Sequence, residues 1–146
     1  MLSLAQFTAV LATMLFAGAA MYISLVEHPA RMGCRTDIAH TVWAPSYKRA
    51  VPVMASLAMI GFLSGVFAWL LGAGLMWLIA ACLILSVVPI TLFVIFPTNN
   101  RLLMPDRDIC SEETRHLLVK WGKLHATRSV LSFCAACLYL WLLVRS

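Results

Sequence analysis

Four long runs without a charged residue constrain this chain more than any other feature. They cover residues 4–26, 52–71, 75–96 and about 129–144. The first three reach the roughly 20 residues that a helix needs to cross a bilayer. The fourth gains length if Arg128 extends its charged end to the headgroups. Because a span must satisfy its backbone hydrogen bonds internally, we predict helices and not barrel strands. The expected fold is all-α, an integral membrane four-helix bundle in one domain over residues 1–146, with spans at about 4–26, 52–71, 75–96 and 126–144.

Composition points to the same class of protein. Of the 146 residues, 62% are hydrophobic and 12% are charged, whereas soluble domains average about 45–50% apolar and about 25% charged residues. The net charge of +5 comes without a basic stripe interleaved with aromatic residues, so nucleic acid is not an expected partner. The five cysteines lack the spacing of a secreted disulfide scaffold. The lipid bilayer is the partner that composition predicts.

The positive charges predict how the chain is oriented. Ten of the eleven Lys and Arg residues fall between the first and second spans or between the third and fourth spans. The link between the second and third spans, residues 72–74, reads "GAG" and has no charge. Since basic residues collect in cytoplasmic loops, we predict two long cytoplasmic loops, both termini outside, and a bacterial inner membrane as the location.

The two halves of the chain repeat one order of residues. After the first span come Pro29, then Trp43, Tyr47 and an arginine; after the third come Pro97, then a Trp-x-x-x-His pair and an arginine. One interpretation is a duplicated two-span unit, a 2+2 internal repeat of the kind found in transporters. The other is coincidence, with Trp and Tyr placed at the membrane interface as usual.

Trp121, His125 and Arg128 are the first candidates for chemistry. Their i, i+4, i+7 spacing puts them on one stripe of a helix. A charge at the end of a span is costly unless it is paired or wet, which favours a stripe that faces the bundle interior. The alternative is an interfacial belt in which Trp anchors the helix and Arg reaches the headgroups. That alternative does not explain why a histidine occupies position 125.

Polar residues also close the first and third spans. Glu27 and His28 end the first span, where Pro29 is expected to stop the helix. A carboxylate there can face the bundle and pair with Arg49, Arg128 or Arg31, or it can form a salt bridge near the headgroups. Asn99, after the third span, can direct its amide inwards or simply help to end the helix.

The histidines and cysteines show no metal-binding motif. No pair among His28, His40, His116 and His125 has close ligand spacing, and no Cys–His zinc pattern occurs. His28 and His125, from different helices, remain candidates for holding haem or copper inside a bundle. The "CAAC" motif at residues 134–137 has redox spacing, but inside a span we interpret these cysteines as packing residues.

The polar motifs "EHPAR", "W...Y.RA", "FPTN..L" and "W...H..R" occur in that order along the chain. With this order the chain resembles the DUF1772 family of small four-helix membrane proteins, also called anthrone-oxygenase-like, over about residues 15–145. The family motif corresponds to Glu27, His28, Pro29, Arg31, Trp43, Tyr47, Arg49, Pro97, Asn99, Trp121, His125 and Arg128.

The resemblance implies an oxidation by O2 of a flat aromatic or phenolic substrate. Some fungal members oxidise anthrones to anthraquinones without an added cofactor, and an anthrone carries an acidic C–H beside a carbonyl. A histidine can remove that proton, and the resulting anion can pass an electron to O2. His125 is then the expected base, with His28 and Glu27 as further catalytic candidates. Substrate-binding candidates are Trp43, Tyr47, Arg49, Asn99, Trp121 and Arg31, and Arg128, Asn99 or Tyr47 would stabilise the oxyanion.

Two other functions stay open on the sequence. One is a haem- or copper-binding membrane redox protein with His28 and His125 as ligands. The other is a non-enzymatic module that binds a lipid or a quinone, for which substitution of His125 would be tolerated. A small apolar chain of this kind is also compatible with a homo-oligomer.

Overall fold

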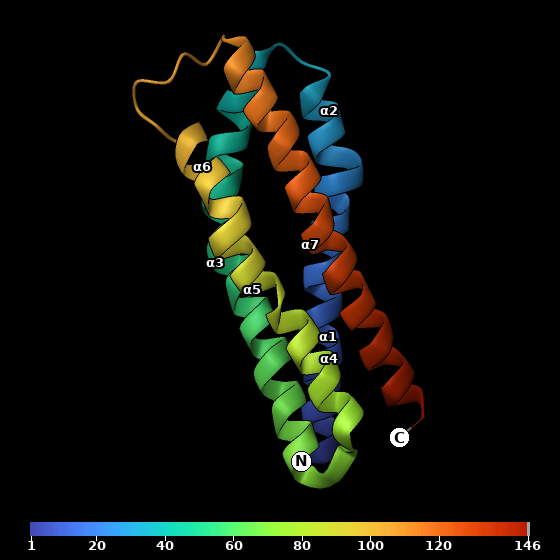
Figure 1. The fold of residues 1–146 in the computed structure, drawn as a ribbon. Coiled ribbons are helices and arrows are strands. Elements are labelled where there is room, and N and C mark those ends of the chain that lie inside the picture. Colours follow the sequence, from blue (N-terminus) through green and yellow to red (C-terminus); the bar gives the residue numbers. More distant parts are fainter. Residues whose placement is uncertain (146) are drawn as a thin grey trace.

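Four long helical rods make up the fold in the computed structural model, which describes residues 1–145 (Figure 1). All four, spanning residues 2–32, 36–73, 75–102 and 112–144, are long and apolar enough to cross a membrane. The predicted all-α class with four such helices is confirmed, and residues 1–145 contain no strand. The elements are α1 (Leu2–Tyr22), η1 (Ile23–Glu27), α2 (His28–Met32), α3 (Thr36–Ala68), η2 (Trp69–Ala73), α4 (Leu75–Leu85), α5 (Val87–Ile90), η3 (Thr91–Ile95), α6 (Phe96–Leu102) and α7 (Glu112–Val144), where η marks a π-helical turn.

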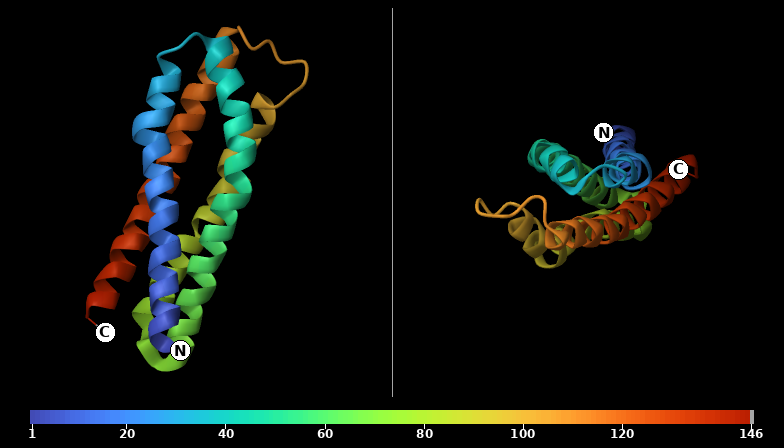
Figure 2. Two further views of the ribbon diagram at one scale, coloured as in Figure 1. Left: turned by 180° about the vertical axis from the view of Figure 1, so that it is seen from behind. Right: turned by 90° about the horizontal axis from the view of Figure 1, so that it is seen from above.

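The rods run up and down and pack as a bundle. Helix α1 packs against α3 and α7, and α4 packs against the same two helices. The start of α1 and the end of α7 lie at one end of the bundle, beside the tight connection from η2 to α4, and the other two connections lie at the opposite end (Figure 2). That tight connection depends on Gly72 and Gly74, whose φ angles of +92° and +96° suit glycine.

The two long loops predicted from the sequence are mostly helix. Only residues 33–35 and 103–111 link the rods at that end, while the rest of residues 27–51 and 97–128 continues the spans as helix. Ser111 is the N-cap of helix α7, and its Oγ accepts a hydrogen bond from the backbone N–H of Thr114 at 3.2 Å. The polar residues within 27–51 and 97–128 therefore do not mark the ends of the helices.

Pro29, which was expected to stop a helix, does not do so, and Pro97 after the third span occupies the same kind of position. Pro29 follows the π-helical turn η1, and Pro97 follows the π-helical turn η3, each as the second residue of the next short α-helix. Proline lacks an N–H and is tolerated in the first turn of a helix. The wide turn before each proline lets the chain restart a helix without a break in direction. The matching arrangement in both halves is what a 2+2 repeat would produce, although the repeat itself stays a prediction.

Small residues fill the half of the bundle that contains the termini. Buried alanines dominate this part of the core, together with Trp77, Tyr139 and Ile84, while large apolar side chains such as Leu63, Leu4 and Leu70 point outwards. Membrane helices pack closely through small residues and expose large apolar ones to lipid. Gly65 shows how close the approach is, because a Cβ there would lie 1.7 Å from the Tyr139 hydroxyl oxygen.

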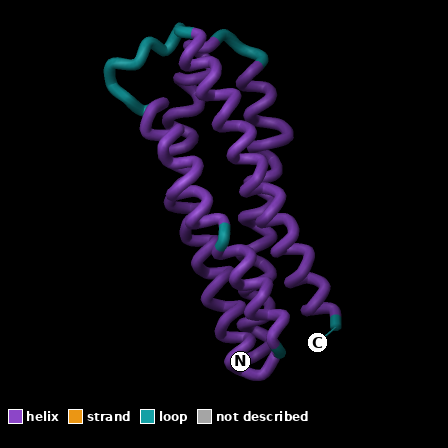
Figure 3. The backbone as a smooth tube through the Cα atoms, in the orientation of Figure 1, coloured by secondary structure: helices purple, strands orange, loops and turns teal. Residues whose placement is uncertain are grey.

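The other half of the bundle is wider and more polar. The rod of residues 75–102 is interrupted at Ser86, between α4 and α5, where Figure 3 marks a short non-helical segment. Beyond this point the core is built around Trp43, Trp121, Ile95 and Leu102. Buried polar residues, including His28, Arg31, Asn99 and His125, gather in the same half. This is the half that holds the candidate site.

Candidate functional site

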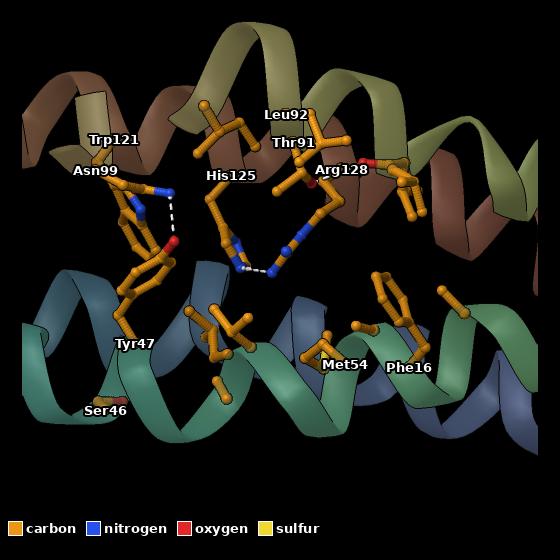
Figure 4. Close-up of a pocket in the computed structure, with 18 of the residues that line it drawn as sticks. Phe16, Ser46, Tyr47, Met54, Thr91, Leu92, Asn99, Trp121, His125 and Arg128 are labelled. Atoms are coloured by element: carbon orange, nitrogen blue, oxygen red, sulfur yellow. Dashed lines mark hydrogen bonds between the residues drawn. The ribbon is translucent and has the colours of Figure 1, made fainter. Parts of the chain in front are cut away.

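A cavity of about 180 Å³ lies between α3 on one side and α5, η3 and α7 on the other. Its wall is mainly apolar and aromatic, with Phe16, Trp43, Met54, Val87, Ile95 and Trp121 among its members. Polar side chains interrupt this wall, and Figure 4 labels all of them except Arg31. They are Arg31, Ser46, Tyr47, Thr91, Asn99, His125 and Arg128.

His125 and Arg128 form the chemical centre of the cavity. Both come from α7, and an Arg128 guanidinium N–H donates to Nε2 of His125 at 2.7 Å (Figure 4). A guanidinium has no acceptor, so His125 must be neutral at Nε2 and accept the bond there. Arg128 also lies over the ring of Phe16, with Cζ 5.5 Å from the ring centroid, a cation–π contact.

The Arg128 charge has no acidic partner. None of the ion pairs among residues 1–145 includes Arg128, and the Nε of Arg128 is buried without a hydrogen-bond partner. A cation in an apolar enclosure is costly unless a negative charge or a set of acceptors meets it. A ligand oxygen with negative or developing negative charge could offset this cost.

Two serines hold the other side of the His125 ring. Ser24, in η1, places its Oγ 2.9 Å from Nδ1 of His125 and 2.8 Å from Oγ of Ser129. Ser129, one turn after His125 on α7, donates to the carbonyl oxygen of Ala20 at 2.9 Å. Both ring nitrogens of His125 are thus engaged, one by an arginine and one by a hydroxyl chain.

The two Trp motifs of the sequence meet at this cavity. Trp43 stacks on Tyr47 at 5.2 Å between ring centroids, and Trp121 stacks on His125 at 4.8 Å. The two indoles contact each other edge to face at 5.8 Å. The Nε1 atoms of both tryptophans are buried without a partner, so the wall contains N–H groups with no acceptor from the protein.

Asn99 reaches the cavity from α6. Its Nδ2 donates to the Tyr47 hydroxyl oxygen at 2.9 Å, and its Oδ1 is buried without a partner. Tyr47 can then donate its own O–H into the cavity, and Asn99 can accept a hydrogen bond from a ligand hydroxyl.

Glu27 and His28 lie behind the cavity wall and do not line it. Glu27 accepts hydrogen bonds from Arg31, the partner predicted as one of three alternatives, and from Ser46 Oγ at 3.1 Å. The ring of His28 lies 5.1 Å from that of Trp121. Both residues can position cavity-lining neighbours, but the structure gives them no direct contact with the enclosed space.

Arg49 is the one candidate that the structure separates from the others. Its side chain is exposed and lines no part of the cavity. On helix α3 it lies two residues after Tyr47, and successive helical residues point about 100° apart. Tyr47 faces inwards, and Arg49 consequently faces outwards.

Sequence reasoning missed Ser24, Ser129, Ser46 and Phe16. A usable signal existed for Ser129, which extends the Trp121–His125 stripe by one turn of helix. No comparable signal existed for Ser24, because its contact with His125 joins residues 101 positions apart and depends on how α1 and α7 pack.

The predicted haem or copper alternative finds no support. Within residues 1–145, no group of three or more His, Cys, Asp or Glu side chains is arranged to hold a metal ion. A ligand histidine needs one ring nitrogen for the metal, but His125 uses Nε2 for Arg128 and Nδ1 for Ser24. A guanidinium at the ligating nitrogen also repels a cation.

Comparison with known proteins agrees with the motifs. Residues 43–138 match the family model described as anthrone oxygenase. The chain is 32% identical over 135 residues to the anthrone oxygenase tpcL of Aspergillus fumigatus, covering 86% of this chain and 84% of the relative. It is 33% identical over 107 residues to the anthrone oxygenase ptaC of Pestalotiopsis fici, covering 60% of this chain and 72% of the relative. No solved structure matches it. The chain belongs to the anthrone-oxygenase (DUF1772) family of membrane proteins.

Proposed function

We propose that this protein is a membrane oxidoreductase that oxidises an anthrone-type, flat aromatic substrate with O2 in the cavity around His125 and Arg128. The observation that carries the proposal is the pairing of a neutral histidine with an arginine that has no acidic partner, inside an aromatic enclosure. A base beside a cation is the arrangement needed to form and hold a carbon acid's anion. The names of both relatives support anthrones as the substrate class.

In the first step, Nε2 of His125 removes a proton from the carbon opposite the substrate carbonyl. The carbonyl oxygen gains negative charge, and Arg128 leaves Nε2 to donate to this oxygen. The electron-rich anion then gives one electron to O2, producing superoxide and a carbon radical. Because the anion itself reduces O2, the step needs no other reductant.

In the second step, superoxide and the radical combine at the same carbon and form a peroxide. The second C–H proton leaves that carbon as the O–O bond breaks. His125, now protonated, first gives its proton to the terminal peroxide oxygen. Neutral again, it takes the second C–H proton and passes it to the departing hydroxide, so that water is released and a second carbonyl remains. The balance is one anthrone and one O2 to one anthraquinone and one water.

The other cavity residues suit the shape and oxygens of such a substrate. Trp43 and Trp121 offer aromatic surfaces, which favour flat ring systems. The Tyr47 hydroxyl, which accepts from Asn99 Nδ2, keeps its own O–H to donate to a ring oxygen. Buried donors and acceptors without protein partners are costly, so a ligand that satisfies them gains specificity.

The test is oxygen uptake by the detergent-purified protein given anthrone or a hydroxylated anthrone, with anthraquinone followed by absorbance. We expect one O2 consumed per anthraquinone formed, at a rate above spontaneous oxidation. His125→Gln should lower kcat by about 10²-fold or more, as expected for loss of a general base. Arg128→Met should lower kcat by about 10²-fold, as expected for loss of oxyanion stabilisation.

The matched control is His116→Gln, because His116 is an exposed histidine on the same helix and lies outside the cavity. Its rate should equal that of the wild type. Full activity of His125→Gln would remove the base assignment. Binding of anthrones or quinones without turnover by the wild type would instead favour the non-enzymatic module.

We also propose that the polar end of the bundle, with residues 33–35 and 103–111, faces the cytoplasm, and that the protein resides in a bacterial inner membrane. The uneven distribution of basic residues supports this orientation. The cavity would then open in the cytoplasmic half of the membrane.

A further inference from the structure

Three consecutive hydrogen bonds, through the hydroxyls of Ser24 and Ser129, connect the His125 ring to a backbone carbonyl oxygen. The chain runs from Nδ1 of His125 to Oγ of Ser24, from there to Oγ of Ser129, and on to the carbonyl oxygen of Ala20, at 2.9, 2.8 and 2.9 Å. Ser129 is buried, and Ser24 lies in the π-helical turn η1. Such wide turns often occur at functional positions.

The number of hydrogens available shows which atom donates in each of these hydrogen bonds. A carbonyl oxygen only accepts, and each serine hydroxyl has a single hydrogen. The Oγ of Ser129 lies 2.9 Å from the carbonyl oxygen of Ala20 and 3.2 Å from that of His125, and its contact with Nδ1 of His125 is longer, at 3.4 Å. Ser129 therefore donates its hydrogen to a carbonyl, because a hydroxyl that donated elsewhere would turn only lone pairs towards both carbonyl oxygens. Ser24 must then donate to Ser129, and the remaining lone pair of Ser24 faces Nδ1. His125 must consequently carry its proton on Nδ1.

The opposite side of the ring leads to the same assignment independently. Arg128 donates to Nε2, so Nε2 holds a lone pair and no proton. The histidine is thus fixed from two directions, by a carbonyl-terminated hydroxyl chain and by a guanidinium. A histidine's tautomer is set by the hydrogen bond that its other nitrogen makes.

We infer that Ser24 and Ser129 are positioning residues that keep His125 in its Nδ1–H tautomer, so that Nε2 presents a lone pair to the cavity when the substrate oxygen draws Arg128 away. The catalytic meaning of this lock depends on the proposed function. Without the serines, departure of Arg128 would leave either nitrogen free to carry the proton. With them, Nε2 takes the substrate proton, and the imidazolium keeps donating from Nδ1 to Ser24.

The tautomer can be measured without turnover, by NMR of detergent-solubilised protein labelled with 15N-histidine. The His125 signals are identified by their loss in His125→Asn. Wild type should show a protonated Nδ1 and an unprotonated Nε2. The same pattern should persist in Arg128→Met, where only the serine chain acts. In the double variant Arg128→Met, Ser24→Ala, a substantial share of the Nε2–H tautomer should appear.

Two variants in the Arg128→Met background serve as controls. Ser24→Thr retains a hydroxyl and should retain Nδ1–H. Ser132→Ala removes a buried hydroxyl of α7 that bonds only to the carbonyl of Ser129, at 3.0 Å, and should also retain Nδ1–H. An Nε2–H tautomer in wild type or in Arg128→Met would overturn the inference, and so would an unchanged Nδ1–H tautomer in the double variant Arg128→Met, Ser24→Ala.

A kinetic measurement tests whether the lock serves the reaction. Ser24→Ala alone should lower kcat for anthrone oxidation roughly tenfold with little change in KM, as expected for one lost hydrogen bond in the transition state. Ser24→Thr should restore it. An unchanged kcat would refute the positioning role, whereas absence of any turnover in wild type, with the NMR pattern as expected, would refute the proposed function and leave the lock intact.

Discussion

His28 and Trp121 meet because residue 122 is a glycine. A Cβ at Gly122 would lie 2.4 Å from Nε2 and 2.5 Å from Cδ2 of His28. The imidazole occupies that space and lies against Trp121, which in turn stacks on His125. Because Gly122 has no side chain, His28 of the first rod can pack against Trp121 of the cavity wall.

Replacing Gly122 by alanine should therefore destabilise the protein. The new methyl group requires the His28 ring to move, and overpacking of this kind costs about 1–3 kcal/mol. The measurement is thermal or denaturant unfolding in detergent. Gly18→Ala is the matched control, because a Cβ at this helical glycine meets nothing within 4 Å. It should leave stability unchanged or raise it by about 0.5–1 kcal/mol. Equal losses in both variants would contradict the explanation.

At the residue scale, sequence periodicity correctly predicted which residues of one helix share a face. The i, i+4, i+7 stripe predicted that Trp121, His125 and Arg128 share a face, and the structure brings all three to one cavity. The prediction is correct because the positions of side chains around one helix depend only on their spacing in the sequence. The partners of these residues could not be predicted in the same way, since Ser24, Tyr47 and Asn99 arrive from other rods. Arg49 was misplaced because a shared motif does not fix the face on which each member lies.

At the scale of the helices, π-helical turns explain why local rules failed at the two prolines. The rule that a helix ends before proline rests on the α-helical pattern of hydrogen bonds. In η1 and η3 the turn is wider, and Pro29 and Pro97 then occupy the first turn of α2 and α6, where no N–H is needed. Sequence patterns contain no simple signal for such a turn. The polar segments were for this reason expected to be loops.

Close packing of helices α3, α4 and α7 depends on Gly65 and Tyr139. A Cβ at Gly65 would lie 1.7 Å from the Tyr139 hydroxyl oxygen and 3.1 Å from Cβ of Ala81. The hydroxyl itself donates to the carbonyl of Gly61 at 3.1 Å.

Gly65→Ala should cost about 1–3 kcal/mol of unfolding free energy through overpacking. Tyr139→Phe should cost about 1 kcal/mol through loss of the buried hydrogen bond. The double variant should lose less than the sum, because removing the hydroxyl frees part of the space that the methyl group needs. Unfolding of the four proteins in one detergent measures the coupling, and strict additivity would contradict direct contact between the two side chains.

For the whole molecule, the number and nature of the spans followed from the lengths and positions of the uncharged apolar runs. Runs of about 20 apolar residues have few alternatives to a membrane helix, and the tight "GAG" connection between the second and third spans is present as a turn at Gly72 and Gly74. The lengths of the helices did not follow, because the positions where apolar residues stop indicate the edge of the membrane and not the end of a helix.

The orientation prediction can be tested with the chain's own cysteines. Cys34 and Cys110 are exposed in the two connections at one end. With Cys82, Cys134 and Cys137 replaced by alanine, an impermeant maleimide should label Cys34 and Cys110 only after cells are permeabilised. Leu75→Cys, an added cysteine at the start of α4, should be labelled in intact cells. The reverse pattern would invert the topology.

Val51 and Leu92 line the cavity and are also exposed on the outer surface of the bundle. In the membrane arrangement proposed above, the rim between α3 and η3 would border the acyl chains and not the aqueous phase. A planar, poorly soluble substrate dissolves in that hydrocarbon, so the quantity that governs saturation is its mole fraction among the lipids. At constant total substrate, adding plain lipid or detergent should lower the rate through surface dilution. Kinetic constants would then describe an encounter in two dimensions, and a value in molar units would have meaning only at a stated amount of lipid.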